Sequence, residues 1–183
     1  STNTVAVRSL QKLGVKNSFE FAKSLGLSTL IENEKTDNGE ILSDMSLAPL
    51  ALGAVTRGVS VRDMTNAYSA LANEGIYHDS ISYTEVYDKD GNLLLSNDEE
   101  GVRIVSAETA DIMTRLLQNV VTSGTASALT LGKSVQVAGK TGTANKLSAQ
   151  GKYVDKKVRT TFVAAFPISN PKYALIVMLD EPK

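Results

Sequence analysis

The chain of 183 residues contains no cysteine and only one histidine, His78. The lack of cysteine excludes disulfides, thiolate nucleophiles and cysteine-based zinc sites. A Ser-His-Asp triad would have to use His78, which stands beside Asp79 just after a helix-like segment. The composition of this segment favours an exposed loop histidine without a catalytic role.

The chain also lacks an excess of charge of either sign and any long apolar run. It has 19 basic and 20 acidic residues, so its overall charge does not indicate binding to nucleic acid or to an anionic membrane surface. No run approaches the roughly 20 apolar residues that span a bilayer. With 42% apolar and 21% charged residues, the composition is typical of one globular domain.

Helical periodicity dominates the first 130 residues. Ser60 and Ser106 are predicted to cap two of the helices, and Asp88-Lys89-Asp90-Gly91 is typical of a hairpin turn between 81–86 and 92–95. The segment 31–44 is polar and is expected to form a loop or turn. The expected helices cover residues 4–13, 18–25, 61–73 and about 106–120.

The C-terminal third changes to short β-branched or apolar runs, which predict strands at 135–138, 161–166 and 173–179. Because the links between them are too short for helical crossovers, the strands are expected to be antiparallel neighbours. The predicted class is α+β, with a helical part over about 1–130 and a sheet over about 135–183.

Lys140-Thr141-Gly142-Thr143 is the strongest candidate site. Lys140 and Thr141 are predicted to end a strand, and Gly142 leaves room for a substrate backbone to pair alongside. The Thr143 N–H group can help to hold an oxyanion, while the Lys140 ammonium and the Thr141 hydroxyl can meet a carboxylate. Alone, the tripeptide Lys-Thr-Gly is weak evidence, because many strands end in a glycine turn.

Ser1-Thr2-Asn3 gives an S-x-N pattern at the start of a helix. The combination of S-x-x-K, S-x-N and K-T-G is the signature of penicillin-interacting serine enzymes. In that chemistry Ser1 would relay a proton and Asn3 would hold the substrate amide. A simple helix N-cap is the alternative interpretation of Ser1 to Asn3.

The resemblance to a known family extends over essentially the whole chain. Five segments resemble the transpeptidase domain of bifunctional, class A penicillin-binding proteins, whereas three segments of the tail resemble the monofunctional, class B septal transpeptidases. The class A-like segments are 47–53, 58–68, 72–77, 106–110 and 120–126, and the class B-like segments are 151–153, 161–167 and 177–182. The resemblance implies the α/β sandwich of penicillin-binding proteins and serine β-lactamases, incomplete at its N-terminal side.

The resemblance implies peptidoglycan cross-linking. A stem peptide ending in D-Ala-D-Ala would acylate the enzyme, lose its last D-Ala and be transferred to an amine of a neighbouring stem, and β-lactams would inhibit this. Ser1, Asn3 and Lys140 would be catalytic, and Thr141, Gly142 and Thr143 would bind substrate. No metal or organic cofactor is implied. The expected location is the bacterial cell envelope, outside the cytoplasmic membrane, with an anchor in a segment not in this chain.

The nucleophilic serine of the family's S-x-x-K motif precedes S-x-N, so we expect it upstream of Ser1. Two S-x-x-K strings occur here, but Ser9 to Lys12 lies inside a helix after S-x-N, and Ser169 to Lys172 is expected to connect two strands. The chain is therefore expected to be a piece of a longer protein. It would need the missing N-terminal part of the domain, or another chain, to complete its sheet.

Two alternatives stay open. A class A β-lactamase would use a deacylating glutamate, and Glu34 with Asn38 has a suitable spacing, but Asp37 stands where that family has an apolar residue. A noncatalytic β-lactam sensor or scaffold would have no chemical need for the intact residues Asn3 and Lys140.

Overall fold

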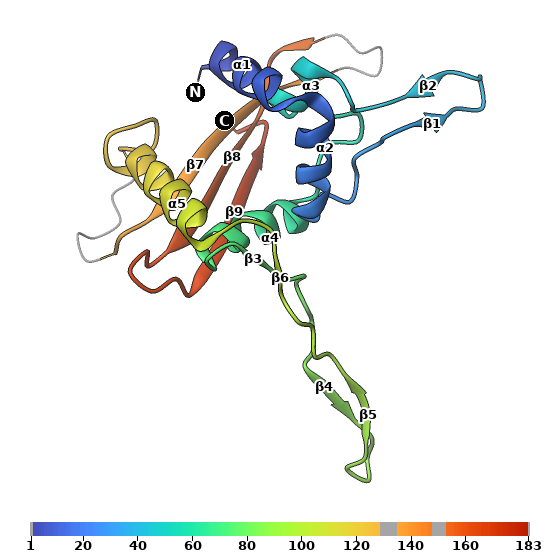
Figure 1. Ribbon diagram of the computed structural model, residues 1–183, viewed down its shortest axis with the longest axis vertical. Coiled ribbons are helices and arrows are strands. Elements are labelled where there is room, and N and C mark those ends of the chain that lie inside the picture. Colours follow the sequence, from blue (N-terminus) through green and yellow to red (C-terminus); the bar gives the residue numbers. More distant parts are fainter. Residues whose placement is uncertain (1, 129–134, 148–152, 183) are drawn as a thin grey trace.

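The computed structural model describes residues 2–128, 135–147 and 153–182. It is a mixed helix and strand fold in which a three-stranded sheet is flanked by helices, while two hairpins project from the body (Figure 1). This arrangement confirms the predicted α+β class.

Five α-helices are present in the described residues. They are α1 (Asn3–Leu13), α2 (Val15–Ser24), α3 (Leu47–Leu52), α4 (Val61–Ala72) and α5 (Ala107–Thr122). The predicted starts of α4 and α5 are confirmed by their caps. The Ser60 hydroxyl accepts a hydrogen bond from the Asp63 N–H group at 3.0 Å, and the Ser106 hydroxyl accepts one from the Thr109 N–H group at 3.2 Å.

The predicted start of the second helix at Ser18 is wrong by three residues. Gly14, with φ of 93°, alone separates α1 from α2. The side chains that resemble a cap instead bond backwards to the residues just before α2. The Asn17 amide donates to the Leu13 carbonyl, and the Ser18 hydroxyl donates to the Gly14 carbonyl.

The main sheet contains β7 (Ala138–Leu147), β8 (Tyr153–Phe166) and β9 (Tyr173–Asp180), in the order β7-β8-β9. Both pairs are antiparallel, as predicted, and 169–172 lies in the connection between β8 and β9. The prediction that Lys140 and Thr141 end a strand is wrong. They lie near the start of β7, which continues because residues up to Leu147 pair with β8.

Three two-stranded sheets complete the described fold. Their strands are β1 (Glu34–Lys35) with β2 (Ile41–Leu42), β3 (Ile76–Tyr77) with β6 (Val102–Arg103), and β4 (Glu85–Tyr87) with β5 (Leu93–Ser96). The polar segment expected to be a loop therefore holds the short β1-β2 hairpin. The β4-β5 hairpin is confirmed and projects far from the body (Figure 1). His78 is exposed, as expected.

Small side chains form much of the core around the main sheet. Helix α4 packs against β8 and β9, and α5 packs against β7 and α4. Small side chains let the helix and strand backbones approach closely. The sheet is partly open to solvent at β9, where Tyr173, Val177 and Leu179 are exposed. The buried small residues are Ala67, Ala70, Ala110, Ala138, Ala164 and Ala165.

A buried carboxylate, Asp44, joins two connections of the helical part. Its side chain accepts hydrogen bonds from the N–H groups of Ile31 and Thr56, at 2.9 and 2.7 Å, and from the Thr56 hydroxyl at 2.6 Å. Only 2% of the residue is exposed. Burial acts to raise the pKa of Asp44, but these hydrogen bonds outweigh burial and hold the pKa below its ordinary value.

Candidate active site

The candidate site is a cavity of about 380 Å³ between α4 and the main sheet. The strand register explains which side chains of the sheet line this cavity. Lys140 pairs with Val163, which pairs with Ile176, so one row of side chains crosses the sheet. The next row on the same face joins Gly142, Thr161 and Met178. The remaining lining residues come from the loop before α4 and from helices α3 and α4: Leu52, Val59, Ser60, Val61, Met64 and Tyr68, together with Thr141 of β7.

Lys140 is the only lysine or arginine that lines this cavity among the described residues. Its ammonium group donates a hydrogen bond to the Thr141 carbonyl at 2.5 Å, and the residue is half-buried. A cation beside a largely apolar lining attracts an anion more strongly than a fully solvated cation does. Lys140 is therefore placed to stabilise negative charge at this wall of the cavity.

Thr141, Gly142 and Thr143 follow along β7. The Thr141 hydroxyl forms a hydrogen bond of 2.8 Å with the Thr125 hydroxyl. A Cβ atom on Gly142 would collide with the Thr161 hydroxyl of β8, so the glycine permits close strand pairing here. Thr143 is exposed. Among the described residues β7 pairs with β8 alone, so its other edge is free to bond an extended peptide.

Asn3 does not join this group. It is the first residue of α1, is exposed, and does not line the cavity. In the described residues α1 packs against α2 and α3 and makes no packing contact with β7. The structure therefore brings Lys140, Thr141 and Gly142 together, with Asn3 outside their cavity. The predicted role of Ser1 falls outside the described residues.

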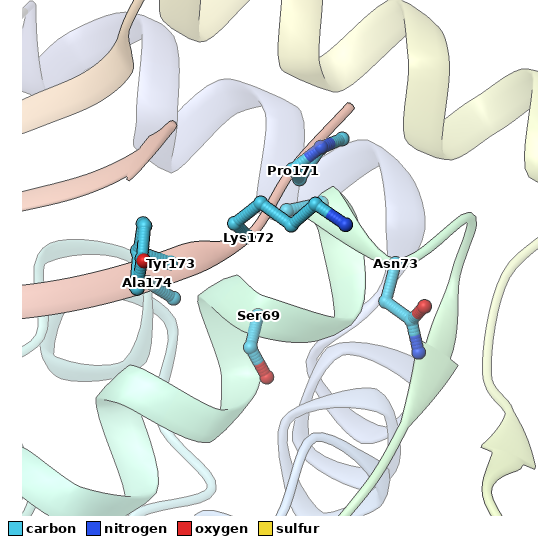
Figure 2. Close-up of a pocket in the computed structure, with 7 residues that line it drawn as sticks. Ser69, Asn73, Pro171, Lys172, Tyr173 and Ala174 are labelled. Carbon is cyan, nitrogen blue, oxygen red and sulfur yellow. The ribbon is translucent and has the colours of Figure 1, made fainter. Parts of the chain in front are cut away.

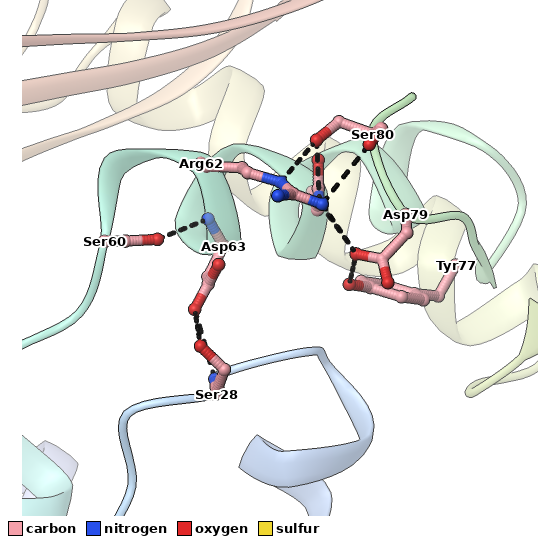
Figure 3. Close-up of polar contacts among 8 residues, drawn as sticks. Ser28, Ser60, Arg62, Asp63, Tyr77, Asp79 and Ser80 are labelled. Carbon is pink, nitrogen blue, oxygen red and sulfur yellow. Dashed lines mark hydrogen bonds and ion pairs between the residues drawn. The ribbon is translucent and has the colours of Figure 1, made fainter. Parts of the chain in front are cut away.

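The N-terminal end of α4 is held in place by polar contacts (Figure 3). The Asp63 carboxylate accepts hydrogen bonds from the Ser28 hydroxyl at 2.6 Å and the Ser28 N–H group at 3.1 Å. Burial acts to raise the pKa of Asp63, but its hydrogen bonds with Ser28 and Ser60 hold the pKa below its ordinary value. This cluster ties the loop after α2 to α4, which forms one wall of the cavity.

A second cavity of about 240 Å³ lies near the other end of α4 (Figure 2). Ser69 and Asn73 of the α4 region face Lys172 and Tyr173 there. Their polar groups are already used in part, since the Ser69 hydroxyl donates to the Asn66 carbonyl and the Asn73 amide donates to the Ile76 carbonyl. None of the predicted site residues that the structure describes lines this cavity.

Sequence reasoning missed two residues of the site, namely Tyr68, which lines the first cavity, and Thr125, whose hydroxyl contacts that of Thr141. In the sequence analysis Tyr68 stands only within the family-like segment 58–68, and Thr125 only within the family-like segment 120–126. The pKa of the Tyr68 phenol is raised by burial, so the phenol stays protonated at neutral pH. Helical periodicity could place Tyr68 toward the sheet, but it gave no indication that a cavity lies there.

Comparison with known proteins decides the family. The family model described as the penicillin-binding protein transpeptidase domain matches residues 1–183. The chain belongs to this family. Penicillin-binding protein 1A of Clostridium novyi is 34% identical over 148 residues, which cover 80% of this chain and 16% of that protein. A peptidoglycan D,D-transpeptidase FtsI homolog of Mesostigma viride is 37% identical over 93 residues, covering 51% of this chain and 15% of that protein.

Solved structures of transpeptidases share the fold. Penicillin-binding protein 3 of Mycobacterium tuberculosis, complexed with aztreonam, superposes with a TM-score of 0.80 at 26% identity and covers 99% of this chain and 43% of its own. The D,D-transpeptidase domain of a peptidoglycan glycosyltransferase from Eggerthella lenta gives a TM-score of 0.75 at 22% identity, covering 100% of this chain and 47% of its own. The latter similarity concerns the fold alone.

The chain spans about a fifth or less of the curated relatives' length, from 16% to 21% in the first few. None of the helices in the described residues has the length and apolar character that crossing a bilayer requires. Within the same residues, Asp, Glu and His side chains do not gather in groups of three or more suited to a metal ion.

Proposed function

We propose that this chain is the C-terminal part of a serine D,D-transpeptidase that cross-links peptidoglycan stem peptides and is acylated by β-lactams. The observation that carries the proposal is the cavity in which Lys140, Thr141 and Gly142 meet beside a free strand edge. Membership of the transpeptidase family and the aztreonam complex of a related protein support it.

Each residue of β7 has a distinct part in this proposal. A substrate peptide that ends in D-Ala-D-Ala pairs with the free edge of β7, where Gly142 has no side chain to obstruct it. Its terminal carboxylate accepts hydrogen bonds from the Thr141 hydroxyl and is attracted by the Lys140 ammonium. The Thr143 N–H group donates to the oxyanion of the tetrahedral intermediate.

The nucleophilic serine is proposed to lie in a segment of the longer protein upstream of Ser1. Ser9, the serine of one S-x-x-K string, is exposed on α1, which packs on α2 and α3 instead of on β7. The cavity beside Lys140 has a largely apolar lining and a volume of about 380 Å³, room for a few side chains of another segment. We place the nucleophile-bearing segment there, with Ser1 and Asn3 supplying proton relay and amide binding from the S-x-N motif.

The alternative of a class A β-lactamase has less support. Glu34 would have to activate a deacylating water, but its carboxylate accepts a hydrogen bond from the Arg57 guanidinium at 2.6 Å and lies on the projecting β1-β2 hairpin (Figure 1). An acyl-enzyme that persists is therefore the expected state, as in a transpeptidase. The proposed location is the outer side of the bacterial cytoplasmic membrane, where peptidoglycan stems are available.

Labelling of the full-length protein with a fluorescent penicillin tests the proposal. We expect a stable acyl adduct that mass spectrometry maps to a serine upstream of Ser1. Lys140→Met is expected to slow acylation by about 100-fold or more, because it removes a charge that stabilises the transition state. Lys89→Met, on the projecting hairpin, serves as the matched control. An adduct at Ser9, or rapid hydrolysis of nitrocefin, would contradict the proposal.

A further inference from the structure

Thr125 contacts the candidate site from outside the Lys-Thr-Gly motif. It lies in the loop after α5, and its hydroxyl oxygen is 2.8 Å from the hydroxyl oxygen of Thr141. The two residues are 16 positions apart in the sequence. In the described residues no other hydrogen bond of the Thr141 hydroxyl is present, so Thr125 is its one fixed partner.

The loop that carries Thr125 is held on both sides of this residue. The Ala126 N–H group donates to the Val120 carbonyl at 3.1 Å, and the Ala126 residue is only 7% exposed. Gly124 passes so close to α5 that an added Cβ atom would lie 2.8 Å from the Val120 Cα atom. Because α5 itself packs against β7, the loop has a fixed position relative to Thr141.

The chemistry of a carboxylate sets the direction of this hydrogen bond. An ionised carboxylate only accepts hydrogen bonds, and a threonine hydroxyl has a single proton to donate. When Thr141 donates its proton to a substrate carboxylate, it must accept from Thr125. Thr125 then fixes the rotation of the Thr141 hydroxyl and polarises it, which strengthens the bond to the carboxylate.

We propose that Thr125 is a positioning residue that orients the Thr141 hydroxyl toward the carboxylate of the substrate or inhibitor. This inference rests on the proposed function. Thr141 is held at two atoms, since Lys140 donates to its carbonyl and its hydroxyl forms a hydrogen bond with the Thr125 hydroxyl. Thr125 thereby contributes to selectivity for ligands that carry a free carboxylate, without touching the reacting atoms.

The test uses the full-length protein and two matched ligands, ampicillin with its free carboxylate and the methyl ester of ampicillin. Thr125→Val keeps the shape of the side chain but removes the donor. It is expected to lower the second-order acylation constant for ampicillin about fivefold, the effect of one neutral hydrogen bond, and to change that for the ester less than twofold. Thr125→Ser is expected to restore ampicillin acylation to within twofold, and Ser127→Ala in the same loop is the control for unspecific loop effects.

Saturation kinetics and a double-mutant cycle separate positioning from a general structural role. The loss in Thr125→Val is expected to appear as weaker ligand binding, with the limiting acylation rate nearly unchanged, because the carboxylate contact exists before and during the reaction. In a Thr141→Val background, Thr125→Val is expected to have no further effect.

The outcomes distinguish this inference from the proposed function. If the unmodified protein is not acylated by either ligand, the proposed function is wrong and the role of Thr125 is wrong with it. Two outcomes with an acylated unmodified protein would refute only the role of Thr125. In one, Thr125→Val lowers the acylation constants for ampicillin and its methyl ester equally, and in the other its effect adds fully to that of Thr141→Val.

Discussion

Asp44→Asn is expected to destabilise the fold without touching the candidate site. Two donors of Thr56 point at Oδ1 of Asp44, and the Ile31 N–H group points at Oδ2. An asparagine amide has one oxygen and one NH₂ group, so in either orientation its NH₂ group faces a donor. The best orientation keeps the bonds to Thr56 and leaves the buried Ile31 N–H group without an acceptor.

The expected cost is about 2–4 kcal/mol in the free energy of unfolding, since one buried donor is left unpaired and the remaining bonds lose a charged acceptor. Equilibrium urea denaturation of the full-length protein at pH 7 measures this. Asp37→Asn, in an exposed turn, is the matched control and is expected to stay within about 0.5 kcal/mol of the unmodified protein.

The pH dependence of this cost has a definite sign. The pKa of Asp44 is lowered in the folded state from an ordinary value of 3.8. The stability that its charge contributes is therefore present above that value and is lost as the pH falls through the lower folded pKa. The gap between the unmodified protein and Asp44→Asn should narrow below about pH 3.8. This account would be refuted if Asp44→Asn lowered the free energy of unfolding no more than Asp37→Asn does, or if its destabilising effect grew as the pH falls.

Two further substitutions test the packing. Phe19→Ala is expected to lower the free energy of unfolding by about 3–5 kcal/mol, because Phe19 is 0% exposed, whereas Phe21→Ala, at 39% exposure, should cost clearly less in the same urea titration. Gly139→Ala is expected to cost about 1–3 kcal/mol and to lower the melting temperature, because its Cβ atom would lie 2.6 Å from the Val163 carbonyl oxygen. An unchanged melting temperature would show that β7 and β8 can separate freely at this point.

Local sequence patterns located α4 and α5 well, because each has a complete local signature, whereas α3 was not among the expected helices and the start of α2 was misplaced. Ser60 and Ser106 begin α4 and α5 as expected, and both helices place apolar residues three or four positions apart. The extent of β7 was harder to predict. Gly139 and Gly142 interrupt the alternation, and the strand is stabilised by pairing with β8. The paired residues lie from 6 positions apart (Leu147 with Tyr153) to 27 positions apart (Ala138 with Ala165) in the sequence.

The site could be predicted only where its residues are neighbours in the sequence. Lys140 to Thr143 are contiguous and were found as a motif. The contacts of Asp44 and Thr125 are long-range, over 12 to 16 positions, and neither residue stands in a pattern that marks a buried acceptor or a positioning hydroxyl. Such contacts depend on how the elements pack, which local periodicity does not encode.

The projecting β4-β5 hairpin has a practical consequence for experiments on this domain. In the described residues its two strands pack only on each other, and residues 89–91 of its turn are exposed at the tip (Figure 1). A probe attached at this tip would lie outside the body of the domain, away from the candidate site (Figure 1). The fluorescence anisotropy of such a probe would report local motion of the hairpin separately from the rotation of the whole domain. The same exposed turn is also a suitable attachment point for single-molecule experiments.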